Sequence, residues 1–496
     1  MAGGQQGTGS RRIGIIGAGP GGICAAIQLL DAGYRDLVVW EQADRVGGTW
    51  HHNTYPGCAC DLPSHLYSCS FARKVDWSRP YATQPEIQAY LQQCVDDHGV
   101  GPYLRLGTGV SAARWDDEAG VWRVTTADGL TTTVDVLISA MGLFNNPHWP
   151  DIPGLDTFAG TSFHSARWDH THDLTGERVG VIGSAASAVQ FVPEIAKVAG
   201  RLYVFSRSPE WVGPKDDTPF SAEQLEVFRT DPAAAAAVRD MIWAGVDVAQ
   251  TFADPDGREA ARQRGLANLA LVEDPEVRAK LTPTYPFGCK RPLISNDWYP
   301  TFNRPTVELV TEPITKVTAD AVVTADGRER AVDTIIAATG FDTTRFLSAI
   351  PVTGRGGRRI EDAWADGAQA YLGITVTGFP NLFMLYGPNT NNGSIIFQIE
   401  CQVAYALRQI GRMDDEHLQW IDVRQEVMDA YNERLQRDLD AVEVWAAEAC
   451  HNYYRNAAGR IVTQWPHGMG VYRDWTSQPD PDAYEVAQAQ APAPAS

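Results

Sequence analysis

Two stretches of the chain share one pattern of hydrophobic and polar positions. The first starts with the apolar run Ile13–Ile16, passes through a glycine-rich turn into an amphipathic helical pattern, and ends in a second apolar run that stops at Glu41. The second starts with Val179–Ile182 and ends with the apolar run Leu202–Phe205. Strand, turn, helix and strand in this order predict one parallel βαβ unit in each stretch.

The first turn has the glycine spacing of a dinucleotide site. It reads Gly17-x-Gly19-x-x-Gly22, and Glu41 closes the second strand 24 residues after Gly17 (17 to 41). In this fold the glycines bring backbone N–H groups to a pyrophosphate at the helix N-terminus, and the acid accepts hydrogen bonds from ribose hydroxyls. A carboxylate would repel a 2′-phosphate, so this unit predicts an unphosphorylated ribose, as in FAD.

The second turn departs from the motif but carries a basic residue where the first unit has its acid. Ala185 places a methyl group where the backbone should approach a phosphate, which weakens the pattern. Arg207 lies 24 residues after Gly183 (183 to 207), as Glu41 does after Gly17. A guanidinium pairs with a 2′-phosphate through two parallel hydrogen bonds, so this unit predicts NADPH. The residues assigned to that cofactor here are Gly183, Ser184, Ala185, Ser187, Gln190, Arg207 and Ser208.

A repeated strand pattern extends the two units to two domains. "DVLISAMG" (135–142) and "DTIIAATG" (333–340) each predict a buried parallel strand that ends at a glycine beside a cofactor. The predicted fold class is α/β, with two Rossmann-like dinucleotide-binding domains, for FAD and NADPH, and a helical insertion. The expected boundaries are 11–150 and 341–480 for the FAD-binding domain with the C-terminal region, 151–215 and 290–340 for the NADPH-binding domain, 216–289 for the insertion, and 481–496 for a disordered tail.

The insertion shows helix-start signals and no strand pattern. Ser221 and Gln224 form a capping box, and Asp231 with Pro232 opens an alanine-rich run. This predicts helices that form a lid or a wall of the active site.

Charge and cysteine content limit the partners and the setting. The net charge of −20 argues against nucleic acid or an anionic membrane as a partner. No apolar run reaches the roughly 18 residues that span a bilayer, and the first residues lack the apolar core of a secretory signal. Eight cysteines over 496 residues do not form a disulfide framework. We therefore expect a reduced, cytoplasmic protein, whose oligomeric state the sequence leaves open.

The stretch "GGTWHHNTYPGCACD" (47–61) concentrates histidines and cysteines and raises the question of a metal site or a redox dithiol. Adjacent His51 and His52 would point apart in a strand. Cys58-x-Cys60 is too tight for the usual zinc pairing, and in flavin disulfide reductases the first redox cysteine stands where this chain has Trp50. We expect no metal and no dithiol here, but a segment that lines a flavin.

Four separated motifs resemble those of type I Baeyer–Villiger monooxygenases. "FAGTSFHSARWD" (158–169) resembles the family fingerprint F-x-G-x-x-x-H-x-x-x-W-[P/D], and 47–61 resembles its second signature. "GCKRPL" (288–293) is similar to the segment that supplies the catalytic arginine, and "ATGFD" (338–342) is also shared. The resemblance runs from residue 11 to about 475, and "YYRNAAGRIVTQWP" (453–466) is most similar to the 4-hydroxyacetophenone monooxygenase branch. The fingerprint positions are Phe158, Gly160, His164, Trp168 and Asp169.

This resemblance implies the reaction and the roles of several residues. The implied reaction uses FAD, NADPH and O2 to insert one oxygen atom next to a ketone carbonyl, giving an ester or lactone through a C4a-peroxyflavin. Arg291 is the implied catalytic cation, and Asp61 is expected to hold it and touch the flavin. Lys290 is expected to bind the 2′-phosphate with Arg207. Thr49, Trp50 and Tyr67 are assigned to the flavin.

Two other functions stay open at this point. One is an N- or S-oxygenating flavin monooxygenase, whose relatives carry Tyr or Phe in place of Trp168. The other is a flavin-binding protein without oxygenase activity, such as a redox sensor. The identity of the ketone is not readable, because the substrate pocket comes from loops and from the insertion.

Overall fold

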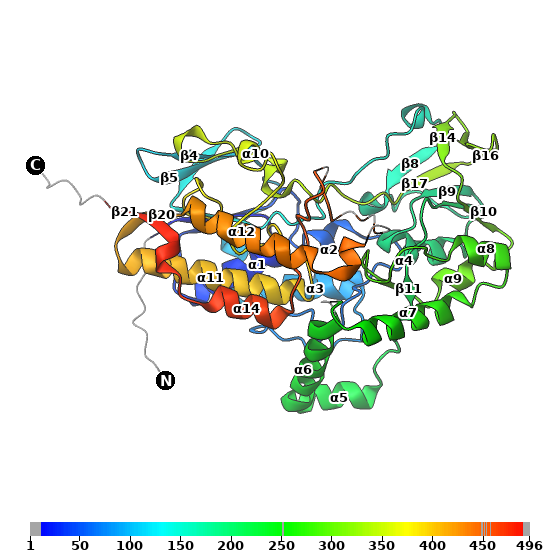
Figure 1. The fold of residues 1–496 in the computed structure, drawn as a ribbon, viewed down its shortest axis with the longest axis horizontal. Coiled ribbons are helices and arrows are strands. Elements are labelled where there is room, and N and C mark those ends of the chain that lie inside the picture. The colour runs from blue at the N-terminus through cyan, green and yellow to red at the C-terminus, as the bar shows by residue number, and fades with distance from the viewer. Residues whose placement is uncertain are drawn as a thin grey trace, which may run out of the picture.

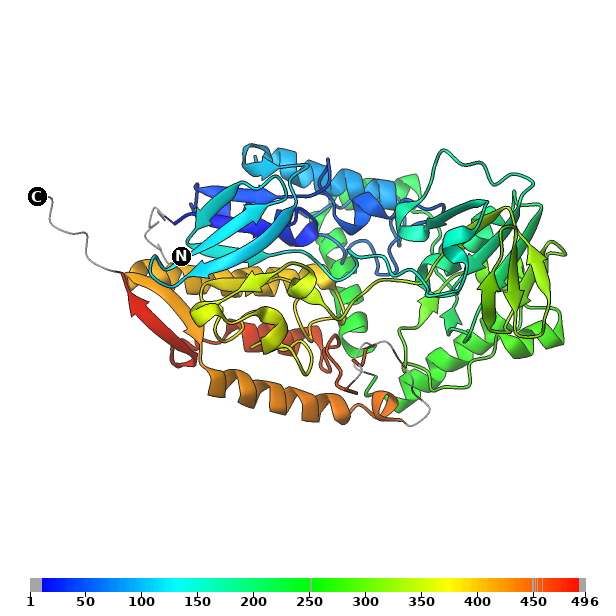
Figure 2. The same ribbon diagram turned by 90° about the horizontal axis from the view of Figure 1, so that it is seen from above.

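The computed structural model describes residues 11–249, 252–447, 450, 452, 454–456 and 458–489. The chain forms two lobes, each built on a parallel sheet, and both ends of the described chain lie in the first lobe (Figures 1 and 2). No helix in these residues is long and apolar enough to cross a membrane.

The first lobe contains a five-stranded parallel sheet in the order β19-β7-β1-β2-β3. The short strands β1, β2 and β7 are buried along their whole length, which explains their continuous apolar sequence. Helix α1 packs against α11 and α3. The strands are β1 (Ile13–Ile16), β2 (Leu37–Trp40), β3 (Leu104–Arg105), β7 (Val136–Ser139) and β19 (Leu382–Met384), and the helices are α1 (Pro20–Asp31), α3 (Gln84–Asp97) and α11 (Ile395–Asp415).

A second, smaller sheet packs on the first lobe through a core that includes Trp40, Trp115 and Trp122. Its order is β18-β4-β5-β6, and nothing in the sequence analysis anticipated it. It consists of β4 (Val110–Asp116), β5 (Val121–Thr126), β6 (Thr131–Val134) and β18 (Val352–Thr353), with α10 (Ile360–Ala363) nearby.

The second lobe repeats the parallel arrangement in the order β13-β10-β9-β17-β8. Helix α4 (Ala186–Ile195) follows β9 and packs against α9 (Trp298–Thr301). The strands are β8 (Thr161–His164), β9 (Arg178–Ile182), β10 (Arg201–Phe205), β13 (Val307–Val310) and β17 (Thr334–Ala337), and an antiparallel sheet adds β14 (Ile314–Val317), β15 (Ala321–Thr324) and β16 (Glu329–Ala331). Both predicted βαβ units are confirmed, whereas the exact domain boundaries stay a prediction.

The first glycine of each βαβ unit approaches the repeated strand in the same way. Gly17 has φ +99°, and a Cβ there would lie 2.6 Å from the carbonyl oxygen of Ala140 in the first repeat. Gly183 has φ +111°, and its Cβ would lie 2.3 Å from the carbonyl oxygen of Ala338 in the second repeat. Each glycine is therefore required both by its left-handed backbone and by the close approach of the neighbouring strand.

The insertion is helical, as predicted, and α5 and α6 project from the body of the molecule (Figure 1). The capping box of Ser221 and Gln224 is present at the start of α5. The parallel pair β11 and β12 closes the base of the insertion. The elements are α5 (Ala222–Thr230), α6 (Pro232–Ala249), α7 (Pro255–Leu269), α8 (Pro275–Lys280), β11 (Val212–Gly213) and β12 (Leu293–Ile294).

The prediction of a disordered tail over 481–496 is wrong for its first part, which is ordered. Residues Tyr484–Gln488 form β21, which pairs antiparallel with β20 (Leu418–Val423). Tyr484 is buried, and its hydroxyl is hydrogen-bonded to that of Tyr405 at 2.5 Å. A polar sequence is thus ordered by strand pairing and one buried aromatic anchor, while 490–496 lie outside the described residues. The helices of this region are α12 (Gln425–Asp440), α13 (Glu443–Ala446) and α14 (Met469–Ser477).

The expectation of reduced cysteines is wrong for one pair. Cys289 and Cys450 form a disulfide, with Cα atoms 5.5 Å apart and 161 positions between them in sequence. Such a pairing depends on the approach of two distant segments, which cysteine spacing does not encode. The other six cysteines are free thiols.

Candidate active site

One cavity of about 320 Å³ opens at the carboxyl ends of the strands of the first sheet, where α/β proteins bind their ligands. Nearly all its wall comes from the first lobe, and Ala186, Gln190 and Arg291 enter it from the second. The sequence-predicted residues that line it are Gly17, Gly19, Glu41, Thr49, Trp50, Asp61, Tyr67, Gln190 and Arg291.

The phosphate end of this cavity is built from two glycine turns in contact. Helix α1 begins after Gly19 without a side-chain cap, so its first N–H groups are available to an anion. A Cβ on Gly48 would lie 2.9 Å from the Cα of Gly19. Gly22 does not line the cavity but is needed for packing, because a Cβ there would lie 1.8 Å from the carbonyl oxygen of Gly17. Because glycines leave room beside these free N–H groups, a dinucleotide pyrophosphate fits here.

Glu41 is buried and fixed by the backbone. Its Oε2 accepts a hydrogen bond from the N–H of Ala18 and its Oε1 accepts one from the N–H of Ala43, both at 2.8 Å. Each oxygen keeps a further lone pair. The carboxyl group therefore stays oriented at the cavity wall, where ribose hydroxyls suit it.

The segment with the histidines and cysteines lies at the cavity wall. His51 and His52 belong to the short helix α2 (Thr49–His52), with ring centroids 4.9 Å apart, so the expectation of a strand was wrong. Burial lowers the pKa of His52 to about 4. The described residues contain no group of three or more His, Cys, Asp or Glu side chains that could hold a metal ion.

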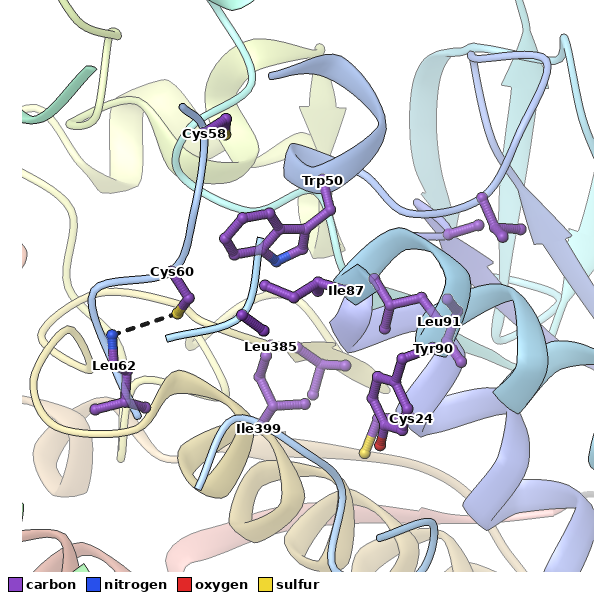
Figure 3. Packing of buried hydrophobic residues seen from close by; sticks show 14 of the residues in the cluster. Cys24, Trp50, Cys58, Cys60, Leu62, Ile87, Tyr90, Leu91, Leu385 and Ile399 are labelled. Atoms are coloured by element: carbon purple, nitrogen blue, oxygen red, sulfur yellow. Dashed lines mark hydrogen bonds between the residues drawn. The ribbon is translucent and has the colours of Figure 1, made fainter. Parts of the chain in front are cut away.

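The two cysteines of this segment are packing residues. Burial raises the pKa of the Cys58 thiol to about 12 and that of Cys60 still further above its usual range. The Sγ atom of Cys60 accepts a hydrogen bond from the N–H of Leu62 at 3.4 Å (Figure 3), and both cysteines belong to a buried apolar cluster. Thiolates are the reactive and metal-binding form, so these protonated thiols suit neither role.

Trp50 and Tyr67 form a fixed aromatic pair on the same wall. The indole Nε1–H donates to the Tyr67 hydroxyl at 2.8 Å, and the rings meet edge to face with centroids 5.6 Å apart. Both side chains are therefore rigid surfaces against which a flat ring system can lie.

Arg291 and Asp61 form an ion pair at the cavity. The Nη2 atom of Arg291 lies 2.6 Å from Oδ1 of Asp61, and the two side chains are 42% and 30% exposed. The expected contact between these residues is present, and it brings together positions 230 residues apart. A partly exposed guanidinium held by a carboxylate is a fixed positive charge facing the cavity.

Lys290 and its polar partners lie on the second lobe, next to Arg291 in the chain but outside the cavity. The Nζ atom of Lys290 donates to Ser208 Oγ at 2.8 Å and to Glu210 Oε1 at 3.1 Å. Tyr285 donates its hydroxyl to Glu210 Oε2 at 2.9 Å, and Lys290 Nζ lies 4.6 Å from the centroid of the Tyr285 ring. Arg207, at the end of β10, is exposed. Of the predicted set, Lys290 and Ser208 are in direct contact, and Arg207 precedes Ser208 in the chain.

Sequence reasoning missed Glu210 and Tyr285. Burial raises the pKa of Glu210, although Lys290 and Tyr285 oppose this shift. Glu210 lies 80 residues from Lys290, and no local pattern marks it. The cavity wall also contains Tyr386, Gly393, Ile395 and Ile399, which the sequence analysis did not single out.

The turn of the second unit is arranged like the first. Helix α4 begins after Ala185 without a side-chain cap. Ala185 has an extended backbone (φ −88°), so its methyl group causes no strain. Gly183 and the buried Ser184 precede it, and the Ser184 hydroxyl is hydrogen-bonded to that of Ser206 at 2.7 Å. Ser187 follows in the first turn of the helix.

Gln190 of α4 joins the two lobes. Its Nε2 donates to the carbonyl oxygen of Ala59 at 2.9 Å, and its Oε1 accepts from the Tyr55 hydroxyl at 3.0 Å. Both partners belong to the cavity-lining segment of the first lobe. The turn of the second unit is therefore attached directly to the wall of the cavity.

The fingerprint residues lie near the same contact between the two lobes. Within the fingerprint, Thr161–His164 form the edge strand β8 of the second sheet. His164 Nδ1 accepts from the N–H of Ala166 at 3.1 Å, and burial lowers its pKa to about 4. Trp168 packs edge to face on Phe191 of α4, with centroids 5.2 Å apart.

The remaining fingerprint positions support that strand. A Cβ on Gly160 would lie 2.2 Å from the carbonyl oxygen of Asp333, and Phe158 packs into the core beneath. Asp169 accepts from the backbone N–H and the hydroxyl of Thr171 at 2.9 and 2.6 Å. These contacts position chain segments and place no side chain in the cavity.

The chain is similar to known proteins over nearly its whole length. Residues 14–225 match the family model described as pyridine nucleotide-disulphide oxidoreductase. The chain is 41% identical over 493 residues to a Baeyer-Villiger monooxygenase of Streptomyces coelicolor, covering 98% of this chain and 93% of the relative. It is 39% identical over 482 residues to a Baeyer-Villiger monooxygenase of Pseudomonas aeruginosa, covering 96% and 91%.

A solved structure is similar in fold over the same extent. The crystal structure of OTEMO in complex with FAD and NADP matches with a TM-score of 0.86 and 30% identity, covering 97% of this chain and 100% of that chain. At these identities and coverages, the chain belongs to the Baeyer–Villiger monooxygenase family.

Proposed function

We propose that this protein is an FAD- and NADPH-dependent monooxygenase that inserts one oxygen atom of O2 next to a ketone carbonyl, giving an ester or lactone. The observation that carries the proposal is the Arg291–Asp61 pair at the wall of the dinucleotide cavity. The family and the similar structure with FAD and NADP support the same assignment.

FAD is the group that suits the cavity of the first lobe. Its pyrophosphate fits the uncapped start of α1 between Gly19 and Gly48, and its ribose fits Glu41. Trp50 and Tyr67 would support the ring system. When bound, FAD supplies the redox chemistry that takes electrons from NADPH and passes oxygen to the substrate.

NADPH suits the second lobe because of how Lys290 is held. An ammonium group has three N–H donors, and Ser208 and Glu210 accept from it. A phosphate placed there would meet a cation already oriented by fixed acceptors, with Arg207 at the end of the adjacent strand. NADH lacks the 2′-phosphate and would make no ionic contact with Lys290 or Arg207.

Arg291 would stabilise the negative charge that develops on oxygen during insertion. Preorganised charges of this kind are worth about 3 kcal/mol or more in a low-dielectric site. Asp61 keeps the guanidinium at the cavity wall. His164 and Trp168 act through position, because they fix β8 and α4 relative to the cavity wall.

The proposal also covers the cellular location of the protein and its branch within the family. We place the protein in the cytoplasm, with the domain boundaries predicted from the sequence, and leave its oligomeric state open. The resemblance of 453–466 to the 4-hydroxyacetophenone monooxygenase branch is a reason to include aryl ketones among the substrates tested.

A product assay tests the function directly. Purified protein with FAD, NADPH and air is offered cyclic, linear and aryl ketones and one aryl sulfide, with NADPH depletion and mass spectrometry as readouts. Esters or lactones that carry one atom from ¹⁸O2 support the proposal. Sulfoxide without any ester would instead indicate an S-oxygenating enzyme, and flavin that NADPH does not bleach would indicate a protein without oxygenase activity.

A further inference from the structure

The segment that carries both cations is attached covalently to the C-terminal region. Cys289 directly precedes Lys290 and Arg291, and its disulfide partner Cys450 follows helix α13. Both cysteines are buried, and Cys450 is the more exposed of the two, at 7% against 0%. The disulfide thus joins the end of the insertion to a part of the chain 161 residues further on.

A second contact supports this junction. The Nε1–H of Trp445 donates to the carbonyl oxygen of Gly288 at 3.1 Å. Trp445 is 1% exposed and belongs to an apolar cluster that includes Leu439, Tyr454 and Trp465. Residues 288 and 289 are therefore held on the surface of a packed C-terminal core.

The same core is connected to the cavity wall. Asn391 Nδ2 donates to Gln464 Oε1 at 2.8 Å, and Asn392 Nδ2 donates to the carbonyl oxygen of Trp465 at 2.9 Å. Gly393, the next residue, lines the cavity. The C-terminal core consequently contacts both the cavity wall and the segment that carries Lys290 and Arg291.

We propose that Cys289 and Cys450 form a thiol–disulfide site that controls the position of Lys290 and Arg291. In the disulfide form, Cys289 is fixed to the C-terminal core, so both cations are confined next to Asp61 and Glu210. Without the bond, the segment keeps the Trp445 hydrogen bond and its own ion pairs but loses its covalent anchor. A less confined cation spends less time in a productive position.

The chemistry of the switch is ordinary thiol–disulfide exchange. A dithiol reductant attacks the more exposed Cys450 sulfur as a thiolate, and Cys289 leaves as a thiolate and takes up a proton. The second thiol of the reductant then attacks the mixed disulfide, which forms the disulfide of the reductant and releases Cys450. The protein disulfide gains two electrons and two protons, and the reductant loses them. In the reverse direction, hydrogen peroxide oxidises the two thiols to the disulfide and is reduced to two molecules of water.

The inference rests on the proposed function for its kinetic consequence and is tested on the holoenzyme. One sample is treated with dithiothreitol and another with hydrogen peroxide, and both are desalted. Peptide mass spectrometry after alkylation reports the 289–450 link, hydrogen–deuterium exchange reports the mobility of 285–293, and steady-state assays report the KM for NADPH and the ester formed per NADPH.

Reduction should abolish the link, increase exchange in 285–293 and raise the KM for NADPH roughly fivefold or more, a usual size for coupling between two sites. Cys450→Ser and Cys289→Ser should behave like reduced protein in both samples. Cys401→Ser removes a free cysteine on α11 and should respond like the parent.

Two results would overturn the inference. One is the absence of the 289–450 link in the peroxide-treated protein. The other is a link whose reduction changes neither exchange in 285–293 nor the KM, which would make the disulfide only a structural staple. Failure of the proposed function is distinct, because then no ketone yields ester while the link and the exchange still respond.

Discussion

Oδ1 of Asp61 lies 2.6 Å from Nη2 of Arg291, and this contact joins the two lobes at the wall of the cavity. Asp61 comes from the segment between α2 and α3, and Arg291 comes from the segment between α8 and β12. The site is therefore complete only when the lobes are in this relative orientation.

Arg291→Ala should separate reduction from oxygenation. FAD should stay bound, because the α1 turn and Glu41 hold it by other contacts, and NADPH should still bleach the flavin. Ester formation should fall by about two orders of magnitude, the effect of losing about 3 kcal/mol of charge stabilisation. NADPH consumption should end in hydrogen peroxide, measured with a peroxidase assay. Arg328→Ala, a change at an exposed arginine of the second lobe, is the control and should keep the parent ester yield; a normal yield from the Arg291 variant would refute the assigned role.

Asp61→Ala should give a milder form of the same defect. The guanidinium remains but loses its 2.6 Å partner, so it occupies the productive position for less of the time. The ratio of ester to hydrogen peroxide should lie between those of the parent and of Arg291→Ala. A ratio equal to the parent value would show that Asp61 does not position the arginine.

Arg207→Ala should abolish the preference for NADPH over NADH. Removing one charged partner of the 2′-phosphate costs about 1.5–3 kcal/mol, or roughly ten- to a hundredfold in affinity. The KM for NADH should hardly change, because NADH has no 2′-phosphate. Lys197→Ala, at an exposed lysine paired with Glu194 in the same lobe, is the matched loss of charge and should leave both values unchanged. Retention of the full NADPH preference in the Arg207 variant would exclude this residue from the phosphate site.

Metal chelators should leave activity unchanged. The raised pKa values of the buried Cys58 and Cys60 thiols oppose the thiolate form that zinc requires. Purified protein should carry flavin and no stoichiometric zinc by elemental analysis, before and after dialysis against EDTA. One equivalent of zinc, lost together with activity, would contradict this interpretation of 47–61.

The Asp422→Asn variant should lose less stability than the parent protein as the pH rises from about 5 to about 8. Burial raises the pKa of Asp422 to about 7, against the N–H of Gly378 and the Arg355 guanidinium 3.7 Å away, while Glu485 adds to the rise. The folded protein therefore holds a proton that the unfolded chain, with a pKa of about 4, has released. This stabilisation is complete below about pH 4 and is lost as the pH rises through about 7.

Thermal unfolding measured between about pH 5 and pH 8 tests this assignment through the linkage of protonation to stability. The parent Tm should fall across this range by more than that of Asp422→Asn, which carries no charge to bury. Asp482→Asn, an exposed change next to β21 in the same region, should follow the parent. Equal pH dependence in the parent and the Asp422 variant would mean that another group titrates.

The sequence by itself determined the two βαβ units and their difference in charge. Apolar runs at strand period and glycines at fixed spacing are local features, so Ile13–Ile16 appears as β1 with identical bounds. The equal spacing of Glu41 and Arg207 from their glycines follows from the repeated unit length. The capping box of Ser221 and Gln224 is likewise complete within four residues.

Only the tertiary structure decided how the separate segments meet. The hydrogen bonds of Lys290 to Ser208 and Glu210, the Cys289–Cys450 bond and the pairing of β21 with β20 join residues 61 to 161 positions apart. The C-terminal strand is only five residues long and is ordered by hydrogen bonds to β20 and by the burial of Tyr484. Such contacts depend on the packing of sheets and helices against one another, which local periodicity does not specify.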